Sequence, residues 1–262
     1  MLPVVRQPAA ILVLLVTGGL LGACASSSHV KPGAGNVVTT GARAGTTPGA
    51  GSGVGDRPLT KTQATAFARA VNLTAADVPG FRVSSEENGH ETPAEKQLKR
   101  RMLHCAGGVG DEHGVVELSS KSFERETNAL KASVSSEVSI ARSSAVAAKE
   151  LAEIRTARVR ECLSHYLNLL FSASRFHGAV GPVSVAHGEP PAPGTTGTFG
   201  WRISATITLR SLRVPIYMDI LGFAYGPAEV TLTSSGLIQP FPAAAQQQLF
   251  SLLVRRAESH RI

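Results

Sequence analysis

The sequence is poor in aromatic residues, which make up 5% of its 262 residues and include a single tryptophan. Proteins that bind single-stranded nucleic acid usually stack bases on aromatic rings beside a basic groove. Lysine and arginine are dispersed here, apart from the stretch "KQLKRR" at 96–101, which is typical of a solvated helix face. The sequence therefore predicts no nucleic-acid partner.

The common catalytic motifs are also missing. The chain contains no G-x-S-x-G, H-E-x-x-H, Walker A or C-x-x-C pattern. The cluster Asp111, Glu112 and His113 is the best candidate for acid–base or metal chemistry, but we favour a plain polar loop after a helix. We therefore predict no catalytic residues, no cofactor and no metal, with an envelope hydrolase of unrecognised site as an alternative.

No apolar run is long enough to span a membrane as a helix. The longest one near the start, from Ala9 to Leu21, has about 13 residues, whereas a span needs roughly 20. Arg6 precedes the run and small residues end it, which is typical of a secretory signal. The sequence "LGAC" at 21–24 resembles the lipobox of bacterial lipoproteins, in which the cysteine is acylated and the chain is cut before it. We predict a signal peptide at 1–23 and lipidation of Cys24; the alternative is an ordinary signal with an incidental cysteine.

Glycine, alanine, threonine, serine and proline dominate residues 25–58, where no apolar periodicity appears. Such a composition cannot bury enough surface to fold. We predict that residues 24–58 are the lipidated cysteine and a flexible linker, with a reach of roughly 30–35 Å by coil scaling. Without Arg6, the net charge of +7 becomes +6, which favours anionic lipids or polymers.

Residues 59–262 are long enough for one globular domain. Helical periodicity or caps mark residues 60–71, 92–106, 143–171 with a break near Thr156, and 241–260. Period-two alternation marks strands at 134–140, 201–210, 213–224 and after the turn at Gly226, with weaker ones at 115–123 and 181–187. The order predicts an α+β fold, a largely antiparallel sheet packed with helices.

Two cysteines lie in this domain, Cys105 and Cys162. Both fall on the apolar faces of predicted helices, and an even number of cysteines in an oxidising compartment suggests a disulfide. We predict one helix-to-helix bridge that would form a rigid wall beside any cleft. Two free buried thiols, or a metal site with His104 and His113, are the alternatives.

The strand 213–224 offers a candidate binding site. Its second face carries Tyr217, Asp219, Leu221 and Phe223 in alternation, and a tight turn near residue 211 would place Arg202 beside them. Aromatic rings with one carboxylate and one guanidinium are common in small-molecule sites. We predict Arg202, Tyr217, Asp219 and Phe223 as ligand-binding residues; the alternative is that helices cover this face and that Asp219 pairs with Arg202.

The lipobox, the linker, the turn "LTAADVPGF" at 73–81 and the α+β domain with a helix-to-helix cysteine pair together resemble actinobacterial cell-envelope lipoproteins. Their domains are similar to a PsbP-like fold and to the extracellular sensor domains of mycobacterial serine/threonine kinases. The resemblance implies a non-catalytic ligand-binding or sensor-like domain, anchored outside the cytoplasm through lipidated Cys24. Its partner would be a small molecule, a lipid or an envelope protein; a structural accessory that binds another envelope protein is the alternative.

Overall fold

Nine strands of the described chain form one antiparallel sheet, in the order β1-β3-β4-β9-β8-β7-β5. β2 pairs with β4 beside β3, and β6 pairs with β7 beside β5. The computed structural model describes residues 59–84, 93–107, 114–127, 130–173, 178–209, 212–260 and 262. The predicted signal peptide, Cys24, the linker and the cluster Asp111, Glu112 and His113 lie outside these ranges.

The strands agree with the sequence pattern where alternation is strict. The strands are β1 (Arg82–Val83), β2 (Gly114–Ser119), β3 (Phe123–Thr127), β4 (Leu130–Ala141), β5 (Gly178–Val180), β6 (Ser184–Gly188), β7 (Gly197–Leu209), β8 (Leu212–Tyr225) and β9 (Ala228–Leu237). The single weak strand predicted at 115–123 is wrong: β2 and β3 are separate, because each pairs with a different half of the long β4.

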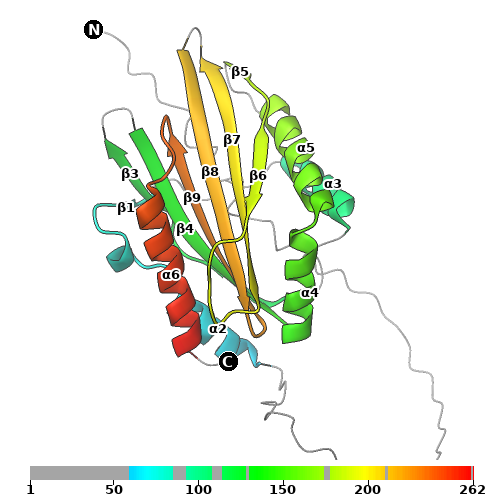
Figure 1. Cartoon of the computed structure of the whole chain (residues 1–262), viewed down its shortest axis with the longest axis vertical. Coiled ribbons are helices and arrows are strands. Elements are labelled where there is room, and N and C mark those ends of the chain that lie inside the picture. Colours follow the sequence, from blue (N-terminus) through cyan, green and yellow to red (C-terminus); the bar gives the residue numbers. More distant parts are fainter. Residues whose placement is uncertain are drawn as a thin grey trace, which may run out of the picture.

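Helices cover both faces of the sheet (Figure 1). They are α2 (Lys61–Val71), the 3-10 turn η2 (Ala75–Asp77), α3 (Pro93–Ala106), α4 (Ser144–Ile154), α5 (Ala157–Ala173) and α6 (Ala243–Ser259). The helices α3, α4 and α5 pack on what we call the first face, where Trp201, Ile203 and Met218 are buried. The helices α2 and α6 pack on the second face, over Val138, Val230 and their neighbours. The fold is therefore α+β in one domain, as predicted.

Local signals set the helix limits. Thr60 and Gln63 form the expected capping box at α2: the Gln63 amide donates to Thr60 Oγ1 at 3.3 Å, and the Thr60 amide donates to Gln63 Oε1 at 3.0 Å. The predicted break near Thr156 separates α4 from α5, and the Thr156 hydroxyl accepts a hydrogen bond from the amide of Val159. Among the helices of the described ranges, none has the length and the hydrophobic composition of a transmembrane segment.

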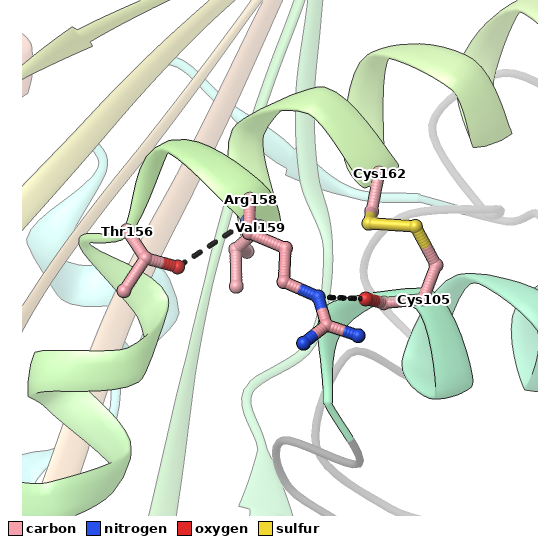
Figure 2. The surroundings of a disulfide bond; sticks show 5 residues. All are labelled: Cys105, Thr156, Arg158, Val159 and Cys162. Atoms are coloured by element: carbon pink, nitrogen blue, oxygen red, sulfur yellow. Dashed lines mark hydrogen bonds between the residues drawn. A yellow bond between two sulfur atoms is a disulfide. The ribbon is translucent and has the colours of Figure 1, made fainter.

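The disulfide between Cys105 and Cys162 joins α3 to α5, as Figure 2 shows. The Cα atoms are 5.8 Å apart, and Arg158 Nε donates a hydrogen bond to the Cys105 carbonyl beside the bridge. Cys162 is buried, but the expectation that Cys105 points into the core is wrong. Helix α3 packs through Met102 and Ala106, so Cys105 lies at the margin of that stripe and is exposed.

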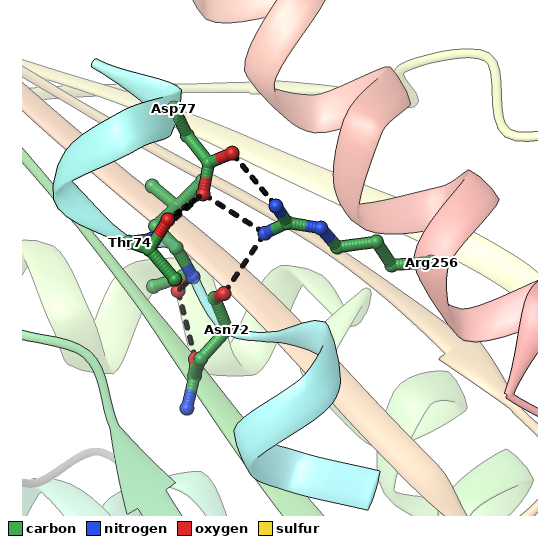
Figure 3. A network of polar contacts seen from close by, with 6 residues as sticks. Asn72, Thr74, Asp77 and Arg256 are labelled. Carbon is green, nitrogen blue, oxygen red and sulfur yellow. Dashed lines mark hydrogen bonds and ion pairs between the residues drawn. The ribbon is translucent and has the colours of Figure 1, made fainter.

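The C-terminal helix is fixed to the start of the domain by Arg256 (Figure 3). Its guanidinium donates to both oxygens of Asp77, at 2.7 and 2.9 Å, and to the carbonyl oxygen of Asn72 at 2.9 Å. Burial raises the pKa of Asp77, but the hydrogen bonds from Arg256 and Thr74 outweigh it and hold this pKa below its ordinary value. The contact holds α6 against α2 and η2 on the second face of the sheet.

Candidate functional site

The four residues predicted as a binding site separate into two groups. Arg202 on β7 lies directly opposite Asp219 on β8, as expected for a tight hairpin. Tyr217 lies two residues along β8, opposite Ser204, and is half-buried. Phe223 is buried in the core, where its ring meets that of Phe250 on α6 at a centroid distance of 5.6 Å. Phe223 is therefore covered by helix α6, whereas Arg202 and Asp219 lie side by side on neighbouring strands.

Arg202 and Asp219 form a two-point ion pair. Nε of Arg202 donates to Oδ1 of Asp219 at 2.7 Å, and Nη2 donates to Oδ2 at 3.2 Å. The Asp219 side chain is only 4% exposed, while that of Arg202 is 56% exposed. The hydrogen bonds and the charge of Asp219 raise the pKa of Arg202 above its ordinary value, so the guanidinium stays charged. The buried carboxylate thus orients an accessible cation.

This ion pair borders a shallow groove on the second face, over β6, β7 and β8. The groove has a volume of about 330 Å³ and also touches Gln246 of α6. Its hollow shape follows from small residues on neighbouring strands, since Gly188 pairs with Gly200 and Ala186 pairs with Arg202. A Cβ atom added at Gly188 would meet nothing within 4 Å. The groove is therefore open because side chains are missing from its floor.

Several of the remaining lining residues are apolar or already paired. Leu221 and Pro190 lie close to Gly200, where an added Cβ atom would approach them to 3.2 and 3.3 Å. The amide nitrogen of Gln246 donates to the Ser234 hydroxyl at 2.7 Å, which fixes this α6 side chain over the sheet. At the rim, Glu189 lies 3.4 Å from Nη2 of Arg155. The charge of Glu189 is thus offset by a neighbour outside the groove.

A second polar feature lies on the first face, where α4 approaches β9. Glu229 is 7% exposed, and its Oε1 atom is a buried side-chain oxygen without a hydrogen-bond partner among the described residues. Burial, together with the charge and a hydrogen bond of Glu150, raises the pKa of Glu229 to about 9. Glu229 is therefore protonated at neutral pH.

The disulfide and the groove lie on opposite faces of the sheet. The groove residues Arg202, Asp219 and Leu221 alternate with the residues that α3 and α5 cover. The expected rigid wall beside the cleft is therefore wrong for this groove, because the bridge pins helices on the other side. Within the described ranges, no cluster of three or more His, Cys, Asp or Glu residues is arranged to hold a metal ion.

Sequence reasoning missed the groove floor and the carboxyl pair. Alternating small residues at Ala186 and Gly188 give a weak signal, but nothing in the sequence places them beside Gly200. Glu229 stands in a strand of mixed polar and apolar residues, so the sequence does not mark it as buried, and its partner Glu150 lies on a distant helix. Both features depend on strand pairing and helix docking.

Comparison with known proteins gives little further information. No family model matches the chain, and no curated protein matches it. Among solved structures, the extracellular domain of PknH from Mycobacterium tuberculosis is similar over 78% of this chain and 100% of that domain, with 8% sequence identity and a TM-score of 0.35. A likeness at this level assigns neither family nor function.

Proposed function

We propose that the protein is an extracytoplasmic lipoprotein, anchored through Cys24, whose globular domain binds a small molecule without transforming it. The groove beside Arg202 and Asp219 carries this proposal. Small-molecule sites usually combine an apolar lining with a few oriented polar groups, in volumes of roughly 300 to 1,000 Å³. The groove, at about 330 Å³, lies at the small end of that range.

Two features support the location. The Cys105–Cys162 disulfide fits an oxidising compartment, because the cytosol keeps most thiols reduced. The lipobox-like "LGAC" at 21–24 and the following linker fit a domain held away from a membrane by a flexible tether. The acylated cysteine would supply the anchor, and the groove would supply the binding function.

Native mass spectrometry of the full chain, purified from its own host, tests the binding function. We expect a small molecule to co-purify with the wild-type chain and to be lost from Gly188→Val, because a side chain there projects into the groove without a clash. Gly114→Val on β2 is the matched control: a Cβ atom there makes only ordinary contacts, the nearest at 3.8 Å, away from the groove. A chain without any bound molecule, or equal retention in Gly188→Val, would contradict the proposal.

A further inference from the structure

Arg202 has donors that its partner does not use. Asp219 engages Nε and one hydrogen of Nη2, so neither hydrogen of Nη1 takes part in the pair. A guanidinium carries five N–H donors in a planar fork. The edge formed by Nη1 and Nη2 of Arg202 therefore keeps two N–H donors that Asp219 does not use. These donors can bind a second oxyanion through two parallel hydrogen bonds. The 56% exposure of the Arg202 side chain makes this edge reachable.

Asp219 does not offer its own charge to a ligand. Its side chain is 4% exposed, and both of its oxygens accept hydrogen bonds from Arg202. A molecule entering the groove consequently meets a guanidinium in front of a covered carboxylate. The other carboxylate at the groove, Glu189, pairs with Arg155 at the rim. At the ion pair, the group that the groove presents is thus the positively charged guanidinium of Arg202, held in a fixed orientation by Asp219.

The groove floor beside this cation is apolar and small. Gly188, Gly200 and Leu221 lie on the same face of adjacent strands as Arg202. A short aliphatic chain fits such a floor, while its charged end would reach the guanidinium. We propose that the groove binds a small molecule through an anionic head, a carboxylate or a phosphate, on the free edge of Arg202, with its apolar part over Gly188 and Leu221. This inference rests on the proposed function and names the ligand class of the same site.

Titration of the full chain in a non-ionic detergent with butyrate, butyl phosphate and butanol tests the inference. We expect the amide resonances of Gly188 and Gly200 to shift with butyrate or butyl phosphate at concentrations at least tenfold lower than with butanol. A preference between the two anions distinguishes a carboxylate ligand from a phosphate ligand. Equal binding of butanol would leave the groove as a small-molecule site but overturn the anionic head. Absence of shifts with all three probes would count against both the inference and the proposed function of the groove.

The matched variant is Arg202→Gln with Asp219→Asn, which removes both charges together. Replacing Arg202 alone would leave a buried carboxylate without its partner and could unfold the domain. We expect the double variant to weaken anion binding at least tenfold and to leave butanol binding unchanged. Arg213→Gln, which removes an exposed arginine from β8 outside the groove, should keep wild-type anion binding. Unchanged anion binding in the folded double variant would overturn the inference.

Discussion

At the residue scale, Glu229 links the stability of the protein to pH. Burial raises the pKa of its carboxyl to about 9 in the folded state, from an ordinary value of 4.5. Between these two values the folded chain holds a proton that the unfolded chain releases. The contribution of Glu229 to stability is therefore greatest below the ordinary pKa and falls as the pH rises toward 9. The Oε1 atom of Glu229 also lowers the stability of the folded state, since a buried acceptor without a hydrogen-bond partner among the described residues is unfavourable.

Glu229→Gln should remove most of this pH dependence. We expect the variant to be more stable than the wild type at pH 8, by about 1–3 kcal/mol, because a neutral amide needs no proton to remain buried. Urea unfolding at pH 5 to 9 measures the difference. Glu161→Gln on α5, which changes an exposed carboxyl, should keep the wild-type pH profile. If the free energy of unfolding of Glu229→Gln depended on pH as strongly as that of the wild type, Glu229 would not be the group that binds the proton.

At the element scale, the disulfide makes α3 and α5 one unit. The bridge spans 57 residues of sequence, so the chain-entropy model gives it about 4 kcal/mol of stability. We expect Cys105→Ala with Cys162→Ala to lower the free energy of unfolding by about that amount. Chemical denaturation of the full chain measures the loss. Reductant should lower the stability of the wild type similarly and leave the double variant unchanged.

The same variant also tests how independent the two faces of the sheet are. Helices α3 and α5 cover the first face, while the groove lies on the second. Retention of a co-purified molecule by the folded double variant would agree with this arrangement. Loss of the molecule from a folded chain would mean that the bridge shapes the groove through the sheet.

Helix α6 explains why only part of the second face is open. Its Phe250 covers Phe223, and Gln246 bonds to Ser234 on β9. Arg256 then fixes the far end of the helix to Asp77 and Asn72. The groove thus lies beside α6, over β6, β7 and β8, where the floor residues are small.

At the scale of the whole molecule, the proposed anchor decides where the groove operates. We expect the wild-type chain in the membrane fraction with an acylated Cys24. Cys24→Ala should release the protein or leave an uncleaved precursor, because the two chains of a diacylglycerol hold a protein stably, whereas a single chain does not. Fractionation with mass spectrometry of the N-terminus measures both outcomes.

The cysteine double variant of the disulfide serves as the control for this experiment. It should remain in the membrane fraction, since Cys105 and Cys162 lie in the folded domain. Wild-type protein that is soluble, with an unmodified Cys24, would rule out the lipid anchor.

Local sequence was sufficient for most of the elements. The strict alternation at 201–210 and 213–224 predicted β7 and β8, and the tight turn between them predicted that Arg202 lies beside Asp219. The capping box at Thr60 and the break near Thr156 were also correct. These features depend on residues close in the chain, where propensity, capping and hydrophobic period act directly.

The sequence by itself therefore determined the α+β class, the helix limits and the pair of cysteines available for a bridge. Only the tertiary structure decided that α6 covers Phe223, that Glu229 meets Glu150 and that Gly188 leaves an open space in the groove beside Arg202. The reason is physical: the alternation of apolar and polar residues along a segment shows which face of a strand each residue occupies. What covers that face depends on packing between elements far apart in the chain.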